Sequence, residues 1–254
     1  MPTAAGLYYF AHGEDLRDRP PVLLLHGAGG SHLSWPPQIR RLTGQRIYAL
    51  DLPGHGKSEG VGMQDIGEYA KSVYEFMKAV RLSNVVVVGI SMGSAIAMSL
   101  ALAYRKRVIG LGLIGSGAKM RVAASTLEGA STLSTFLPTV EAVIENSYSS
   151  NVDPRVKELA VQQMTETRQA VLYGDFLACD EFDVMERVSK IDVPTLIICG
   201  SQDRMTPPSR SAYLHERIKD SQMHILEETG HMAMIEKPDE VAGLLAKFVD
   251  QIPY

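Results

Sequence analysis

The stretch GISMGS, residues 89–94, places a serine between two glycines, directly after four valines at 85–88 and before the small-residue segment AIAMSLALAY. The valine run predicts a buried strand, and the segment that follows predicts a helix. Glycines on both sides of Ser91 indicate a backbone that bends sharply and packs closely, because a Cβ would obstruct it. This part of the chain therefore predicts a tight strand–turn–helix unit with a serine at its corner.

Composition and charge are those of a folded globular chain. It has 254 residues, of which 45% are hydrophobic and 21% charged, and its formal net charge is −4. The length fits one large domain or a domain with an insertion, and the composition predicts a substantial buried core. A nucleic-acid partner is not expected, because such proteins usually carry a basic face.

The sequence gives no sign of export or membrane insertion. No signal peptide is recognisable, and no run of about 18 apolar residues predicts a membrane span. The two cysteines, Cys179 and Cys199, are too few for a disulfide framework, so a cytoplasmic protein is expected. Cys199 lies inside the apolar run TLIICG and is expected to be a buried strand residue.

Short apolar runs alternate with longer helix-like segments along the chain. The runs predicted to be strands are 22–26, 46–52, 84–90, 108–115, 195–200 and 222–227, with 7–13 as an antiparallel edge strand. The segments predicted to be helices are 66–80, 94–104, 208–220 and 237–252. Most of the strands are apolar throughout, which is typical of strands covered on both faces. The alternation predicts an α/β fold with a mostly parallel, doubly wound sheet, whose functional residues gather at the carboxyl ends of the strands.

One interval, residues 118–187, interrupts this alternation with helix-like pieces and no strand-like run. It is too long for a plain loop, so we expect a helical cap over one end of the sheet. The predicted organisation is a core of residues 1–117 and 188–254 with the cap at 118–187. The cap carries six Lys and Arg against eleven Asp and Glu, a balance that offers little help in binding highly anionic substrates.

Three residues that follow predicted strands could act together in nucleophilic catalysis. Ser91 lies in a G-x-S-x-G pattern between a strand and a helix, the context of a nucleophile elbow. A serine hydroxyl needs a base, and the base needs an orienting acid. Asp203 follows the run TLIICG, and His231 follows the last predicted strand. Taken alone, the Asp could cap a turn and the His could be an exposed loop residue, but together they have the order Ser, Asp, His of α/β-hydrolases.

The glycine-rich segment HGAGGSHLSW follows the first long strand and could supply hydrogen-bond donors. Glycines would let backbone N–H groups approach a developing oxyanion, and the expected donors are the amides of Ala28 and Met92. A dinucleotide-binding loop would require a third glycine where His32 stands. A generic tight turn is the remaining alternative.

Two further kinds of site are not expected. DLPGHGKSEG resembles a phosphate-binding loop, but Asp51 stands where that motif requires glycine, so we interpret His55 as a loop residue. The seven histidines share no short spacing with carboxylates of the kind that binds metal, so no metal site is predicted.

Aromatic side chains of the cap are candidates for lining an acyl pocket. They are Phe136, Tyr173 and Phe176, together with Trp35 just beyond the glycine-rich loop. The alternative is that most cap aromatics pack the cap on itself and on the sheet, and that Trp35 packs a helix.

Taken together, HGAGG, DLPGHGKS, GISMGS, GSQDRMTPP and GHMAMIEKP resemble, in order and context, the motifs of the α/β-hydrolase superfamily over nearly the whole chain. The resemblance implies an eight-stranded, mostly parallel sheet with a helical cap inserted after the sixth strand, and no organic cofactor or metal. It also implies that Ser91 is the nucleophile, His231 the general acid–base and Asp203 its orienting carboxylate. Haloalkane dehalogenases of this superfamily use an aspartate nucleophile, so Ser91 argues against that branch.

The function expected from the sequence is a carboxylesterase-type serine hydrolase. Its substrate would be a small-molecule ester with a small, largely uncharged acyl group, cleaved through an acyl-enzyme intermediate. Two alternatives stay open. One is a carbon–carbon bond hydrolase or enol-lactonase with the same triad, and the other is a ligand sensor with a slow or vestigial triad.

Overall fold

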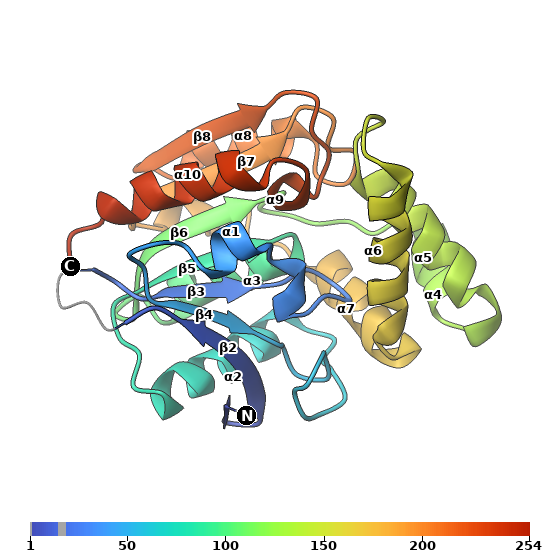
Figure 1. Cartoon of the computed structure of the whole chain (residues 1–254), viewed down its shortest axis with the longest axis horizontal. Helices are drawn as coiled ribbons and strands as arrows, with labels where there is room; N and C mark the ends of the chain where they lie inside the picture. The colour runs from blue at the N-terminus through green and yellow to red at the C-terminus, as the bar shows by residue number, and fades with distance from the viewer. Residues whose placement is uncertain (1, 15–18) are drawn as a thin grey trace.

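A single eight-stranded sheet forms the centre of the computed structural model, which describes residues 2–14 and 19–254 (Figure 1). The strand order is β1-β2-β4-β3-β5-β6-β7-β8. The strands are β1 (Thr3–Ala4), β2 (Leu7–His12), β3 (Val22–Leu25), β4 (Ile47–Leu50), β5 (Val85–Ile90), β6 (Val108–Ile114), β7 (Thr195–Gly200) and β8 (Ser221–Leu226). The six strands from β4 to β8 in this order run parallel, which confirms the predicted α/β fold.

Helices cover both faces of the sheet. The described helices are α1 (Pro37–Arg40), α2 (Ile66–Ala79), α3 (Met92–Ala103), α4 (Ala124–Ala130), α5 (Leu133–Ser147), α6 (Pro154–Glu166), α7 (Gln169–Glu181), α8 (Pro208–Arg217), α9 (Ala233–Glu236) and α10 (Pro238–Asp250), with short 3-10 turns η1 (His32–Ser34) and η2 (Val188–Lys190). Helices α2, α3 and α8 share one hydrophobic cluster with the sheet, and α1, α9 and α10 share the other.

The parallel strands are buried on both faces, as their continuous apolar sequences predict. Along β3, Leu23 and Leu25 pack into the cluster with α2 and α3, while Leu24 packs into the opposite cluster. Val87 and Val88 of β5 divide in the same way. Because successive side chains of a strand point to opposite faces, a strand between two helical layers needs apolar residues at every position.

The antiparallel strand predicted at 7–13 is present as β2, which pairs with β4 in antiparallel register. It is not the outermost strand, because the two-residue strand β1 pairs with its other side. So short a strand carries no periodic pattern, which is why the sequence did not reveal it.

Helices α4 to α7 form a separate group beside the sheet, within the segment 118–187 that we call the cap. They have a hydrophobic cluster of their own, which includes Val140, Ile144 and Leu172. The two ends of the cap meet where Met120 N–H donates to Phe182 O (3.2 Å) and Val184 N–H donates to Ala118 O (2.8 Å). Figure 1 shows the cap helices on the side toward which the arrowheads of β3, β6 and β8 point, beside the carboxyl ends of the parallel strands.

Candidate active site

Ser91 is the single residue between the end of β5 and the start of α3, and its backbone is strained. Its φ of 53° and ψ of −119° lie outside the helical and extended regions. Such a conformation costs about 1–3 kcal/mol in a non-glycine residue and persists only where the surroundings enforce it. A Cβ on Gly89 would lie 2.2 Å from Gly93 O, and one on Gly93 would lie 2.2 Å from Leu25 O. Backbone atoms therefore leave no room for a side chain at either position, which is why both glycines are required.

Asp203 and His231 form a buried hydrogen-bonded pair. Asp203 follows β7 and His231 follows β8, and His231 Nδ1 lies 2.8 Å from Asp203 Oδ2. Asp203 Oδ1 accepts from the backbone amides of Met205 (2.9 Å) and Thr206 (2.8 Å). The Thr206 hydroxyl donates to Oδ2 at 2.8 Å and lies 3.2 Å from His231 Nδ1. This network holds the carboxylate in one orientation toward the imidazole.

The ionisation of Asp203 follows from these partners. Burial favours the neutral acid, but the charge and hydrogen bond of His231 and the donors of Thr206 outweigh it, so the pKa of Asp203 lies below its ordinary value. A carboxylate at this position can accept only, so Nδ1 of His231 carries a proton. In the neutral imidazole Nε2 then has a free lone pair. Nε2 is buried, and no described residue forms a hydrogen bond with it.

Ser91 and His231 line the same cavity. No direct hydrogen bond joins the Ser91 hydroxyl to Nε2 among the interactions of the described residues. Hydrogen bonds of this kind are often long or poorly aligned until substrate binds. The imidazole of His231 also packs closely against Gly115, which has a φ of +51°. A Cβ added at Gly115 would lie 2.8 Å from Cε1 of His231.

The glycine-rich loop after β3 lies beside the serine. A Cβ on Gly27 would lie 3.4 Å from the Cβ of Ser91. The loop closes as a turn in which Gly30 N–H donates to Gly27 O at 3.1 Å. Ala28 lines the cavity, and Met92 is the first residue of α3, where a backbone amide has no partner within the helix. Of the two residues expected to donate, Met92 thus directly follows Ser91, and Ala28 directly follows Gly27, which lies against Ser91.

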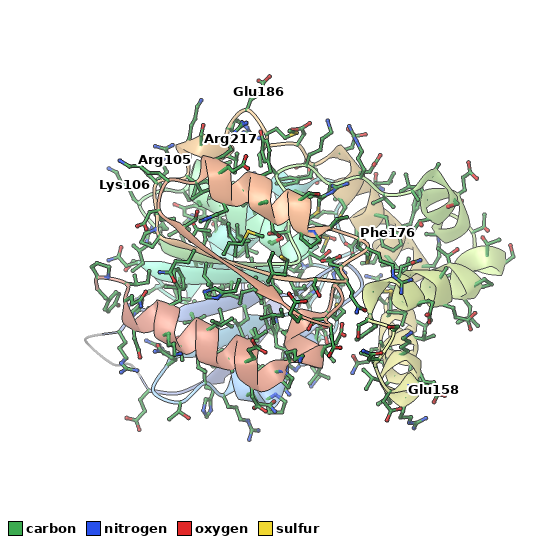
Figure 2. All side chains as sticks on the ribbon, turned by 90° about the horizontal axis from the view of Figure 1, so that it is seen from above. Arg105, Lys106, Glu158, Phe176, Glu186 and Arg217 are labelled. Carbon is green, nitrogen blue, oxygen red and sulfur yellow. The ribbon has the colours of Figure 1, made fainter. Side chains whose placement is uncertain are left out.

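The cavity has a volume of about 550 Å³, within the range of small-molecule sites. Its apolar lining comes from both sides of the cap boundary: Val143, Ile144, Tyr148, Met164 and Phe176 from the cap, and Met205, Met232 and Ile235 from the core. Figure 2 labels Phe176 where the cap meets the core and Glu158 at the far end of the cap.

Of the four residues predicted to line the pocket, only Phe176 does so. Trp35 is 0% exposed and packs with Ile39 in the core cluster that includes α10. Phe136 and Tyr173 pack against the cluster inside the cap. For these three residues the structure supports the packing alternative. Trp35, which follows η1, packs against the sheet, and Phe136 and Tyr173 pack between the cap helices.

A second buried polar network was not anticipated. Asp175 of α7 is completely buried and accepts from three groups: Gly29 N–H (2.9 Å), His55 Nε2 (2.8 Å) and the Tyr69 hydroxyl (2.6 Å). His55 is a loop residue, as predicted, but it is 1% exposed. The one sequence signal was a lone Asp inside the otherwise apolar run VLYGDFLAC.

Metal and membrane features are limited in the part of the chain that the structure describes. Residues 2–14 and 19–254 contain no group of three or more His, Cys, Asp or Glu side chains that could hold a metal ion. No helix among them has the length and apolar character required to cross a membrane.

Known proteins share both the sequence pattern and the fold. The family model for the alpha/beta hydrolase fold matches residues 20–238. The chain is 26% identical to 3-oxoadipate enol-lactonase 1 of Acinetobacter baylyi, over 92% of this chain and 90% of that protein. It is 27% identical to the pimeloyl-(acyl-carrier protein) methyl ester esterase of Neisseria meningitidis, over 90% of this chain and 92% of that protein. The enol-lactonase of Burkholderia xenovorans has the same fold, with a TM-score of 0.90 at 22% identity and 96% coverage of both chains.

The chain therefore belongs to the alpha/beta hydrolase fold family. It is a hydrolase, which is the activity common to the relatives named above. Their names differ in the bond cleaved, a lactone in one case and a methyl ester in the other, so the family does not fix the substrate.

Proposed function

We propose that the chain is a serine hydrolase of carboxylic esters with small, largely uncharged acyl groups. The proposal rests on the arrangement of His231. Its Nδ1 is hydrogen-bonded to the buried carboxylate of Asp203, and its Nε2 has no hydrogen-bond partner among the described residues. His231 also lines the same cavity as Ser91. An imidazole held in this tautomer is a general base for a serine hydroxyl. The largely apolar lining of the cavity supports an uncharged acyl group.

In the proposed mechanism the Ser91 hydroxyl oxygen attacks the ester carbonyl carbon, and His231 Nε2 takes the hydroxyl proton. The Ala28 and Met92 amides donate to the oxyanion of the tetrahedral intermediate. As the intermediate collapses, His231 returns the proton to the leaving alkoxide and the acyl group stays on Ser91. Water then attacks the acyl-enzyme, again with His231 as base, and releases the acid. Asp203 keeps Nδ1 protonated throughout.

Replacement of the serine tests the proposal. Ser91→Ala should abolish turnover of p-nitrophenyl butyrate while the circular dichroism spectrum stays that of the parent. Ser99→Ala is the matched control, because it removes the hydroxyl of a half-buried residue on the same helix α3 that does not line the cavity. A Ser91→Ala enzyme that hydrolyses the ester at the parent's rate would refute the assignment. A series of acyl-chain lengths would then measure the size of the pocket.

Enol-lactone hydrolysis is a second candidate, favoured by the similarity to the enol-lactonase of Acinetobacter baylyi. The same serine, histidine and donors can open an enol-lactone, because the electrophile is again a carbonyl carbon. The leaving group is then an enolate, which takes the proton from His231 and remains part of the ring-opened acyl chain. Parallel kcat/KM measurements on enol-lactones and open-chain esters distinguish the two substrates. Sustained turnover of either would exclude the sensor alternative, which predicts tight binding and at most a few turnovers.

The low cysteine count supports a cytoplasmic setting for this activity.

A further inference from the structure

Both peptide groups of Gly29 are held by side chains of the cap. Its N–H donates to Asp175 Oδ2 at 2.9 Å, and its carbonyl accepts from the Thr167 hydroxyl at 3.0 Å. Asp175 lies on α7, and Thr167 directly follows α6. Gly29 is 146 and 138 residues away from these two partners along the chain. The middle of the glycine-rich loop is therefore fixed by the cap as well as by its own strand.

The loop packs closely against the cap at Gly29. Gly29 has a φ of +65°, and a Cβ there would lie 2.9 Å from Leu172 Cδ1 and 3.0 Å from Met164 Cγ. Leu172 and Met164 belong to α7 and α6, the helices adjoining the two polar contacts. Side chains of the cap thus touch Gly29 on an apolar side and hold it on both polar sides.

The Asp175 carboxylate is itself fixed by the core. The Tyr69 hydroxyl of α2 donates to Oδ1, and His55 Nε2 faces Oδ2. His55 Nδ1 faces the Pro53 carbonyl at 3.0 Å, so both ring nitrogens lie against acceptors and both carry protons. Burial opposes a charge on His55, but the charge and hydrogen bond of Asp175 outweigh it and raise its pKa above the ordinary value. The result is a buried ion pair between the cap and the core.

The geometry of the loop passes this restraint to Ala28. Gly27 O accepts from Gly30 N–H (3.1 Å) and lies 2.7 Å from His26 Nδ1, which fixes the plane of the peptide that contains the Ala28 N–H. Gly29 and Gly30 close the other half of that turn. If the peptides of Gly29 rotate, the turn opens and the Ala28 N–H changes direction.

We propose that Asp175 and Thr167 are positioning residues through which the cap aims the Ala28 N–H at the reacting carbonyl. This inference rests on the proposed function, since it assigns a purpose to the loop only if Ala28 is an oxyanion donor. The cap then completes the catalytic site in addition to covering the cavity. Asp175 does not line the cavity, so any effect of its replacement on the chemical step must pass through other residues.

Three variants test the inference. Asp175→Ala removes the acceptor and should lower kcat about 100-fold, which is the lower end of the ~10²–10³ loss typical when an oxyanion donor is deleted outright. Asp175→Asn keeps an oxygen that can accept from Gly29, so it should recover kcat to within about tenfold of the parent. Thr167→Val is nearly isosteric, removes one neutral hydrogen bond and should lower kcat about tenfold. Thr165→Val is the matched control, because its hydroxyl bonds only within α6.

Two readouts separate positioning from a loss of packing. KM for p-nitrophenyl butyrate should stay within about twofold while kcat falls, because the oxyanion contact forms in the transition state. Affinity for an alkylboronic acid, which forms a tetrahedral adduct on serine, should fall by the same factor as kcat. The inference is overturned if folded Asp175→Ala keeps the parent's kcat and boronate affinity, or if the variants raise KM alone. If Asp175→Ala does not fold, Thr167→Val decides through kcat and boronate affinity, because Thr167 itself lines the cavity and its replacement can change KM directly. The proposed function fails separately, if parent turnover does not depend on Ser91.

Discussion

Gly115 confines the imidazole of His231, so replacing it with alanine should damage catalysis more than folding. The added Cβ would lie 2.8 Å from Cε1 and 2.9 Å from Nδ1, whereas ordinary contacts begin at 3.4 Å. The ring must therefore move by roughly 0.6 Å, the difference between 3.4 Å and 2.8 Å. A displacement of this size along the Nδ1–Oδ2 hydrogen bond would stretch it from 2.8 Å to beyond the usual limit of about 3.2 Å.

The expected consequences can be measured separately. Misplacement of a catalytic group by about 1 Å can cost 10²-fold in rate, so we expect kcat/KM for p-nitrophenyl butyrate to fall about 10- to 100-fold. Alanine in the left-handed region at φ +51° costs about 1–2 kcal/mol. For a protein of this size that lowers the Tm by about 2–4 °C per kcal/mol, which leaves Gly115→Ala folded at assay temperature.

Gly243→Ala is the matched control, because an added Cβ there meets no atom within 4 Å. Gly243 lies inside α10, where alanine is favoured over glycine by about 1 kcal/mol, so this variant should gain stability and keep the parent's kinetics. The reasoning about His231 is refuted if Gly115→Ala loses thermal stability but keeps kcat/KM within twofold of the parent.

Two further outcomes follow from buried charge and hydrogen bonding. Asp203→Asn should lower kcat about 10⁴-fold, as the same change does in other serine triads, with the folded circular dichroism spectrum kept; a rate near the parent's would contradict the orienting role of Asp203. His26 is fully buried, and burial and the nearby His55 lower its pKa to about 4. As pH falls below 6.5, His26 is therefore protonated in the unfolded chain before it is protonated in the folded chain. His26 should therefore contribute a loss of about 3 kcal/mol of unfolding free energy between pH 6.5 and 4. Urea titrations of the parent and His26→Gln measure this, and parallel pH curves would contradict it.

The elements that bear the predicted triad could be derived from sequence because each depends on local chemistry. Four valines before GISMGS are typical of a strand covered on both faces. Gly89 allows α3 to approach β5 closely, and Gly93 allows it to approach β3. Asp203 and His231 could be placed because parallel strands bring their carboxyl ends to one edge of the sheet. The order Ser, Asp, His along the chain then predicted that the three residues act together.

The pocket could not be derived in the same way. An apolar side chain on a cap helix can face the cavity, another cap helix or the sheet, and the helix crossing angles decide which. Phe176 and Tyr173 are three residues apart on α7, yet only Phe176 reaches the cavity. Trp35 was misplaced because the direction of a side chain after η1 depends on how that turn docks, which no local pattern specifies.

Asp175 was missed for a related reason. A single aspartate in a helical sequence ordinarily faces solvent, because an unpaired charge is too costly to bury. Its burial becomes intelligible only when His55 and Tyr69 are known to meet it, and they lie 120 and 106 residues away along the chain. Partners at such separation leave no trace in hydrophobic periodicity.

The ion pair between Asp175 and His55 also limits how the caps of related hydrolases can be exchanged. The acid belongs to the cap and the imidazole to the core, so a transplanted cap with an apolar residue at 175 would leave His55 Nε2 buried without its acceptor. A buried polar group left without its partner typically costs about 1–3 kcal/mol, a sizeable share of the roughly 5–15 kcal/mol that keeps a domain folded. Recombination between these proteins should succeed mainly where both members of the pair are inherited from the same parent.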